Sequence, residues 1–214
     1  GIQKEMRQSI RNDVPVSLDS ARLVAGVDVS MTRFNPLLTA GAVIWDRISG
    51  EVVETASAQT NATFPYIPGL LSFREIPALL LAIQKLQREP DVWLVDGHGI
   101  AHPRRLGIAA HLGMVINRPT IGVAKSRLTG TYPELPDAAG SNVPLMDGPE
   151  QIGVVYRSKL KSNPLFLSPG HLVDLPSAVA IVQACFKGYR LPEPTRLAHN
   201  FVNDVRIGSA ATLF

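Results

Sequence analysis

The sequence predicts an α/β protein built on one mixed β-sheet with helices on both of its faces. Three segments that we expect to be strands, at residues 23–29, 39–45 and 51–59, precede helical segments that alternate with two short buried strands. Successive strands joined by short turns form an antiparallel meander, whereas strand–helix–strand units place their strands in parallel. Because no internal repeat and no linker is visible, we expect a single domain over residues 1–214.

The spacing of apolar residues predicts each element of the first half. Ile2, Met6 and Ile10 recur at helical spacing, which predicts a short amphipathic helix. Residues 23–29 (LVAGVDV) form an almost continuous apolar run, as expected of a strand that is buried on both faces. The apolar positions of residues 71–88 follow a helical period, so we expect a helix there.

The other two strands of the meander are expected at residues 39–45 and 51–59. A turn through Ser49–Gly50 joins them, which is typical of a hairpin connection.

The middle of the chain reads as strand, helix and strand. Residues 92–95 (VWLV) and 120–123 are short buried strands, and residues 102–117 are expected to form the helix between them. Pro103 is tolerated in the first turn of such a helix, because its missing N–H has no partner there in any case.

The last third of the chain is less regular. Residues 132–151 are rich in Pro, Gly and Asp and are expected to form a loop. Residues 153–156 and 164–167 are a candidate strand pair, and residues 177–186 are the last helix that the pattern predicts. The tail, residues 191–214, carries no clear pattern.

Composition excludes several classes of protein. A hydrophobic fraction of 45% and a net charge of +3 exclude a disordered chain, and a single Cys excludes a disulfide scaffold. No apolar run approaches the roughly 20 residues that a membrane span needs. We therefore expect a cytoplasmic protein with no membrane partner.

The positive charge is concentrated in one segment. Residues 1–96 carry a net charge of −2 and residues 97–190 a net charge of +5. Clusters of Lys and Arg neutralise phosphates, although a solvated surface has the same composition.

Carboxylates at strand ends are candidate metal ligands. Asp28 interrupts the first apolar strand, and Asp96 follows directly after VWLV. Buried acids on neighbouring strands need hydrogen bonds, a shared proton or a cation, and oxygen ligands favour Mg²⁺ or Mn²⁺. Glu75 is either a third ligand or the partner of Ser72 in a capping box. Asp174 is either a fourth acid of the site or a helix N-cap.

A loop rich in Gly, His and Arg follows Asp96. Its residues are Gly97, His98, Gly99, His102, Arg104 and Arg105. Ligands bind at the carboxyl ends of parallel strands, and a helix N-terminus with two Arg suits a phosphate. Lys125, at the end of the next strand, is placed to stabilise charge on a phosphate or is simply a surface residue. The spacing matches no zinc signature, so the residues favour a metal-dependent site that processes phosphates.

Six stretches of the chain together resemble the endonuclease V family of deoxyinosine-specific repair nucleases. They occur in the family's order and span most of the chain. The stretches are GVDVS (26–30), FPYIPGLLSFREIPALL (64–80), DGHGIAHPRRLGIAAHLG (96–113), PTIGVAKSRL (119–128), NPLFLSPGHLVDLPSA (163–178) and KGYRLPEPTR (187–196). The resemblance implies a ribonuclease H-like fold, which agrees with the order of elements above.

The resemblance also implies roles for individual residues. Asp28 and Asp96 are expected to bind Mg²⁺, for which Mn²⁺ may substitute, and Glu75 is expected to be the catalytic glutamate. His102 and Lys125 match positions near the scissile phosphate. The expected reaction is hydrolysis of the second phosphodiester bond 3′ to hypoxanthine in DNA, which leaves 3′-hydroxyl and 5′-phosphate ends.

Recognition of the base requires that it leave the helical stack. Tyr66 matches the aromatic residue of the family's PYIPG wedge, and His171 with Asp174 matches its GH-x-x-D stretch. The expected substrate-binding residues are Pro65, Tyr66, Ile67, Pro68, Gly69, Gly97, His98, Gly99, Arg104 and His171. The expected partner is DNA that contains deoxyinosine or other deaminated bases, bound by a monomer.

Three alternatives remain from the sequence. The first is a ribonuclease that acts on inosine-containing RNA, as eukaryotic relatives prefer. The second is a non-catalytic nucleic-acid-binding module, although Asp28, Glu75 and Asp96 are all intact. The third is a nucleotide-binding enzyme that uses the DGHG loop, although no GxGxxG follows the first strand.

Overall fold

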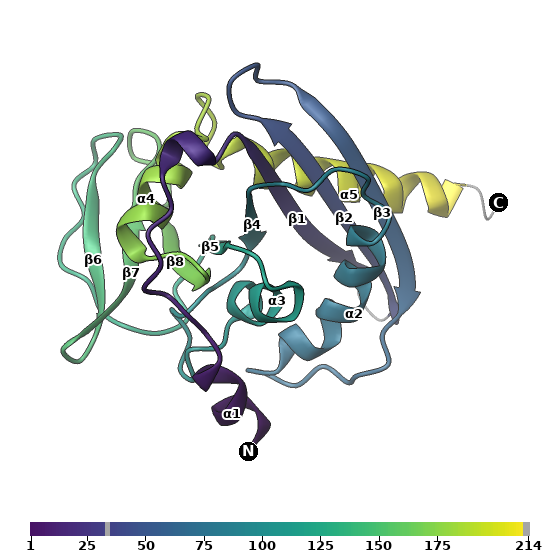
Figure 1. The fold of residues 1–214 in the computed structure, drawn as a ribbon, viewed down its shortest axis with the longest axis horizontal. Helices are drawn as coiled ribbons and strands as arrows, with labels where there is room; N and C mark the ends of the chain where they lie inside the picture. Colours follow the sequence, from purple (N-terminus) through teal and green to yellow (C-terminus); the bar gives the residue numbers. More distant parts are fainter. Residues whose placement is uncertain (33–34, 212–214) are drawn as a thin grey trace.

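The computed structural model describes residues 1–32 and 35–211 and contains one eight-stranded mixed sheet, in the order β3-β2-β1-β4-β5-β8-β7-β6 (Figure 1). The strands are β1 (Leu23–Met31), β2 (Leu37–Asp46), β3 (Val52–Asn61), β4 (Val92–Asp96), β5 (Thr120–Ala124), β6 (Asn142–Asp147), β7 (Glu150–Tyr156) and β8 (Leu165–His171). The helices are α1 (Ile2–Gln8), α2 (Leu71–Ile83), α3 (Ile108–Ile116), α4 (Leu175–Gln183) and α5 (Glu193–Ala211), with a short 3-10 helix at Leu18–Ser20.

The predicted meander and the strand–helix–strand units are both confirmed. Strands β1, β2 and β3 pair antiparallel, whereas β1, β4 and β5 are parallel neighbours. The carboxyl ends of β1, β4 and β5 therefore meet at one edge of the sheet. In the ladder Val27 pairs with Val95 and Asp96 pairs with Val123, so Asp28, the next residue of β1, and Asp96, the last residue of β4, are brought to that edge.

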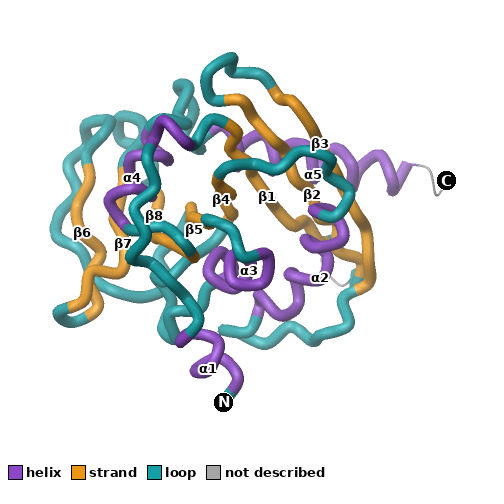
Figure 2. The backbone as a smooth tube through the Cα atoms, in the orientation of Figure 1, coloured by secondary structure: helices purple, strands orange, loops and turns teal. Residues whose placement is uncertain are grey.

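Side-chain alternation along the strands supplies a core on each face. Val24 and Leu94 pack in the core beneath α4, whereas Ala25 and Val95 pack beneath α2 and α3. This period of two is what a sheet covered on both faces requires. The tube in Figure 2 shows α2 and α3 on one side of the sheet and α5 running across β1 and β2 on the other.

Helix α5 lies unusually close to the sheet because β1 has a glycine at the crossing. A Cβ added at Gly26 would lie 1.8 Å from the carbonyl oxygen of Pro194, just inside α5. Gly41 of β2 has the same role, since an added Cβ would lie 2.4 Å from a methyl carbon of Val202. The two glycines set the distance at which α5 passes the strand that carries Asp28.

Two helix predictions were wrong in part, since α3 starts later than expected and α2, which begins at Leu71 as expected, ends at Ile83 and not at residue 88. The helix expected from residue 102 begins only at Ile108, because Arg105 has a positive φ of 57°, which a helix excludes. The capping box at Ser72 does not form. Leu70 is the N-cap of α2, and the Ser72 hydroxyl is 3.0 Å from Nδ1 of the buried His111.

The expected loop at residues 132–151 was also wrong in its second half. Strands β6 and β7 form a hairpin there, with a turn at Gly148, whose φ is 58°. Periodicity missed β6 because Pro144 and a short, partly exposed strand weaken the pattern. The expected pair at 153–156 and 164–167 is confirmed as part of β7 and β8. The tail without a pattern contains α5, which is the longest helix of the described residues.

None of the helices in the described part of the chain has the length and hydropathy that crossing a membrane requires.

The spacing between α5 and β1 can be tested with Gly26→Ala. The added methyl group collides with the backbone of α5, so we expect the free energy of unfolding to fall by about 1–3 kcal/mol, as overpacking does. Thermal or urea unfolding measures the change. The control is Gly208→Ala on α5, where an added Cβ meets no atom within 4 Å. Equal stability of Gly26→Ala and the unmodified protein would contradict the close packing of α5.

Candidate nuclease site

The edge formed by β1, β4 and β5 brings three predicted residues together. Asp28 lies within β1, one residue after the last position that pairs with β4, Asp96 ends β4, and Lys125 follows β5. Lys125 Nζ donates to Asp96 Oδ2 at 2.8 Å, and the Val29 amide donates to Asp28 Oδ1 at 2.8 Å. The two carboxylates and the ammonium group are therefore fixed in place by the ladder of parallel strands.

Burial and mutual repulsion perturb the acids of this edge. The pKa of Asp28 is raised to about 6 by burial and by the charge of Asp96. Helix α2 places Glu75 nearby, and the pKa of Glu75 is raised to about 7 by burial and by the charges of Asp28 and Asp96. Clustered carboxylates with raised pKa values are typical of functional sites, and a cation would relieve their repulsion.

A fourth residue, which the sequence did not reveal, reaches this cluster from α5. His199 Nδ1 is 2.9 Å from Asp28 Oδ2, and Asn203 Nδ2 is 3.2 Å from His199 Nε2. Asn203 and His199 are one helical turn apart, and Ser30 Oγ in turn donates to Asn203 Oδ1 at 3.2 Å. The signal was absent from the sequence because nothing local relates residue 199 to residue 28.

The cluster has the donors that a divalent cation needs. One potential ligand atom from each of Asp28, Asp96 and His199 lies within 4.8 Å of the other two. Two carboxylates favour a hard cation, and an imidazole is also accepted by first-row transition metals. Glu75 does not belong to this group of three, so its predicted place as a direct ligand is not reproduced there.

His102 is held as a neutral imidazole on the loop after β4. Burial and the neighbouring charges of Arg104 and Arg105 lower its pKa to about 4, with His98 also contributing. The Arg104 amide donates to His102 Nδ1 at 3.1 Å, so the ring proton resides on Nε2. His102 is thus prepared to donate a hydrogen bond.

A buried arginine anchors this loop to the β6–β7 hairpin. The Arg105 guanidinium donates to Asp147 at 2.7 Å and to Glu150 at 2.8 Å, and also to the carbonyl of His102 at 2.9 Å. Charge-assisted bonds of this kind are stronger than neutral ones. The hairpin that the sequence analysis missed therefore supports the loop that carries His102.

The acids open into a cavity of about 790 Å³. Many of the predicted site residues line this cavity, so the acids and the wedge loop (residues 65–69) surround the same cavity. They are Asp28, Tyr66, Pro68, Gly69, Glu75, Asp96, Gly97, His98, His102 and Arg104. Tyr66 is 67% exposed, so it is free to contact a substrate and does not pack in the core.

Five predicted substrate-binding or metal-binding residues do not line this cavity, namely Pro65, Ile67, Gly99, His171 and Asp174. Pro65 and Ile67 belong to the wedge loop but do not line the cavity. Gly99 is buried, and its amide donates to Ser168 Oγ at 2.8 Å. His171 pairs with Thr120 at the start of β5, which is the opposite end from Asp96. The sequence analysis therefore grouped together residues that lie on two edges of the sheet.

His171 and Asp174 have structural partners at that opposite edge. The Arg11 amide donates to His171 Nδ1 at 3.1 Å. Asp174 is the N-cap of α4 and accepts from the Ser177 amide at 2.8 Å, so of its two predicted roles the structure supports the cap. Both residues fasten neighbouring segments and stand apart from the acidic cluster.

Known proteins include a matching family and several similar structures. The family model described as Endonuclease V matches residues 4–200. Endonuclease V from Streptomyces avermitilis is 39% identical with a TM-score of 0.92, covering 98% of this chain and 92% of that chain. The catalytic domain of human endonuclease V is 32% identical with a TM-score of 0.90, covering 98% and 95% of the two chains.

The similar structures include complexes with nucleic acid. Endonuclease V from Ciona intestinalis, in complex with a 24mer DNA containing an inosine followed by a ribo-adenosine, is 29% identical with a TM-score of 0.85, covering 97% and 95% of the two chains. An Argonaute from Marinitoga piezophila, 14% identical with a TM-score of 0.52 over 86% of this chain and 30% of that chain, shares the fold alone. The ribonuclease H-like fold class is confirmed.

Charge repulsion at the site predicts a gain in stability from Glu75→Gln when divalent cations are chelated. At pH 8 the carboxylate is ionised in both states, and the folded state bears the cost of burying it. A pKa raised from 4.5 to about 7 corresponds to up to about 3 kcal/mol. The cost of burying the ionised Glu75 carboxylate develops as the pH increases from 4.5 to about 7. Glu75→Gln removes this cost, so it should stabilise the protein at pH 8 and have no such effect at pH 4.

Thermal unfolding in EDTA at the two pH values measures this effect. Glu51→Gln, at an exposed turn, is the control and should change neither value. An unchanged or lower melting temperature for Glu75→Gln at pH 8 would show that Glu75 bears no such cost.

The contact between α5 and Asp28 predicts that His199 contributes to cation binding. We expect His199→Ala to weaken Mn²⁺ binding by about 10- to 100-fold, in line with losses seen when metal-site residues are removed. Asn203→Ala should have a smaller effect in the same direction, because Asn203 only orients the ring. Titration calorimetry gives the affinities, with the exposed Asn200→Ala on the same helix as control. Unaltered affinity in His199→Ala would remove this residue from the cation site.

Proposed function

This chain belongs to the endonuclease V family, and from that premise we propose that it hydrolyses DNA at the second phosphodiester bond 3′ to deoxyinosine, using Mg²⁺ or Mn²⁺. The observation that carries the proposal is the shared cavity, in which the acidic cluster and Tyr66 of the wedge loop line the same space. The complex of the Ciona intestinalis relative with inosine-containing DNA supports the choice of substrate.

Asp28, Asp96 and His199 would hold the cation. When bound, the cation supplies Lewis-acid chemistry for phosphodiester hydrolysis, polarising a phosphate oxygen and lowering the pKa of water. The protein contributes the fixed positions of these donors, which parallel strands and the close crossing of α5 provide.

The remaining polar residues would manage protons and charge. Glu75, with a pKa of about 7, is poised to accept a proton from the attacking water near neutral pH. His102 carries its proton on Nε2 and would donate it in a hydrogen bond to a phosphate oxygen. Lys125 places a positive charge beside Asp96, where negative charge accumulates on the phosphate.

Recognition would require the lesion base to leave the stack. Tyr66 projects from a loop stiffened by Pro65 and Pro68 and is exposed enough to enter the space that the base vacates. The flipped base would occupy the cavity beside Gly69 and Gly97, where small residues allow close approach. Other deaminated bases are further candidate substrates for the same pocket.

The reaction itself tests the role of the acids. Asp96→Asn removes charge with little change in shape, and we expect nicking of a deoxyinosine duplex with Mg²⁺ to fall by about 1,000-fold, because cation chemistry contributes several kcal/mol. A sequencing gel locates the cut, and EDTA should abolish it. Matched deoxyuridine, abasic, mismatch and inosine-RNA substrates define the range. Full activity of Asp96→Asn, or a stronger cut in RNA than in DNA, would contradict the proposal.

Tyr66 is tested by discrimination between lesion and normal DNA. Tyr66→Ala should bind Mn²⁺ as the unmodified protein does, while its preference for deoxyinosine over deoxyadenosine duplexes falls by about 5- to 100-fold, as the loss of one base–aromatic stack predicts. Tyr66→Phe keeps the ring and should retain most of the preference. If Tyr66→Ala discriminates as well as Tyr66→Phe, the ring is not a wedge.

A further inference from the structure

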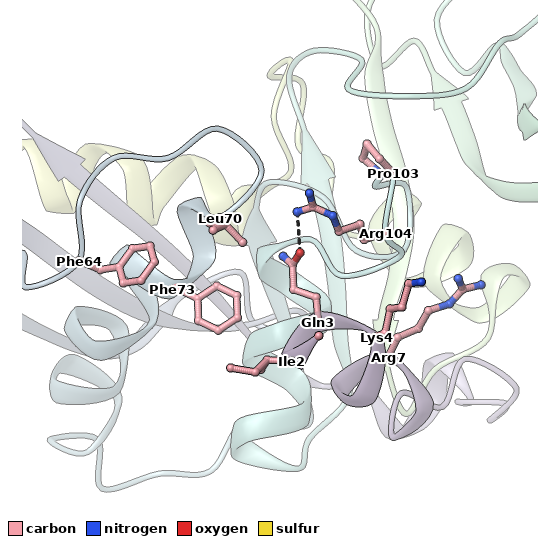
Figure 3. A pocket seen from close by; sticks show the side chains of 10 residues that line it. Ile2, Gln3, Lys4, Arg7, Phe64, Leu70, Phe73, Pro103 and Arg104 are labelled. Carbon is pink, nitrogen blue, oxygen red and sulfur yellow. Dashed lines mark hydrogen bonds between the residues drawn. The ribbon is translucent and has the colours of Figure 1, made fainter.

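A second cavity lies beside the wedge loop, on the side of α1. It measures about 740 Å³, within the range of ligand pockets, and it meets the first cavity at Pro103 and Arg104 (Figure 3). None of the family motifs described above assigns it a role. Its walls come from three separate parts of the chain, namely α1, the segment around α2 and the loop after β4.

Aromatic side chains line one end of this second cavity, and positively charged side chains line the other. Phe64 and Phe73 lie at one end, with ring centroids 6.0 Å apart. Lys4 and Arg7 extend from α1 on the other side of Gln3, and Arg104 lies above it (Figure 3). No acidic side chain is among the residues that line the cavity in the described part of the chain. A ligand that suits both ends has a flat ring and a negative charge, which is the chemistry of a nucleotide.

The wedge loop forms the partition between the two cavities. Phe64 and Leu70, which flank the loop, line the second cavity, whereas Tyr66 inside the loop lines the first. Gln3 fastens α1 to this partition, because its Nε2 donates to the carbonyl of Gly69 at 3.2 Å. Its Oε1 accepts from Arg104 Nη1 at 2.6 Å. If the wedge loop separates the two strands of a DNA duplex, each separated strand therefore has a cavity beside it.

We propose that the second cavity binds the nucleotide that faced the lesion in the duplex. The inference rests on the proposed function, since a flipped lesion leaves its partner base without a pair. The lesion enters the cavity that holds the acids, and the unpaired partner stacks on Phe64 or Phe73 across the loop. Lys4, Arg7 and Arg104 neutralise the phosphates of that complementary strand.

Binding affinities for three matched deoxyinosine probes test whether the second cavity binds the base opposite the lesion. The first probe is a duplex with deoxyinosine opposite thymidine, the second is the same duplex with an abasic site opposite deoxyinosine, and the third is the deoxyinosine single strand. Binding is measured in EDTA to prevent cleavage. The unmodified protein should bind the first probe about 5- to 100-fold more tightly than the second, the value of one base–aromatic stack.

Two variants assign the difference to the second cavity. Phe64→Leu keeps the apolar character of the wall and removes a ring, so the preference for a base opposite the lesion should fall. Arg7→Glu should weaken duplex binding but leave single-strand binding unchanged. Arg88→Glu, an exposed charge reversal just before β4 at the opposite edge of the sheet, is the matched control. Equal affinity of the unmodified protein for the first two probes would overturn the proposal.

A crosslink locates the base. 5-Iododeoxyuridine opposite deoxyinosine should crosslink on irradiation to a peptide that contains Phe64 or Phe73, and a crosslink confined to other peptides would overturn the assignment. Cleavage of the deoxyinosine single strand with Mg²⁺ separates the two proposals. If that strand is cut while the opposite base has no effect, the proposed function stands and the second cavity has no such role. If no deoxyinosine substrate is cut, the proposed function fails as well.

Discussion

The repulsion between Asp28 and Asp96, held side by side where the parallel pairing of β1 and β4 ends, is the constraint on which the rest of the site depends. The ladder between β1 and β4 fixes their separation, so neither acid can withdraw from the other. The pKa of Asp28 rises to about 6 as a result of burial and this charge. Lys125 and His199 each contact one of the two carboxylates, and both contacts reduce the cost of keeping them together.

Single residues outside the acidic cluster hold the groups of the site in position. Gly26 allows α5 to approach β1 closely enough for His199 to reach Asp28. Arg105 ties the loop after β4 to the β6–β7 hairpin through two acids. A substitution at Gly26 or Arg105 would displace site residues such as His199 and His102 while leaving those residues themselves unchanged. This is because packing against distant parts of the chain sets the positions of the site residues.

The sequence predicted those parts of the molecule that local patterns encode. Strands β1, β2, β4 and β5 contain apolar runs of the kind that buried strands need, and Asp28 and Asp96 stood out as acids within them. The start of α3 was wrong because the positive φ value of Arg105, a residue other than glycine, leaves no signal in the sequence. His199 was missed for a related reason, since its contact with Asp28 spans 171 positions and leaves no local pattern. His171 and Asp174 matched a motif, but strand direction places them at the opposite end of β5.

The central claim is that Asp28, Asp96 and His199 form a cation site at the edge of the sheet. The most direct measurement is anomalous diffraction from crystals of this protein soaked in MnCl₂. We expect an anomalous peak at coordination distance from a carboxylate oxygen of both Asp28 and Asp96. A peak bound only by other residues, or no peak at this cluster at a saturating Mn²⁺ concentration, would contradict it.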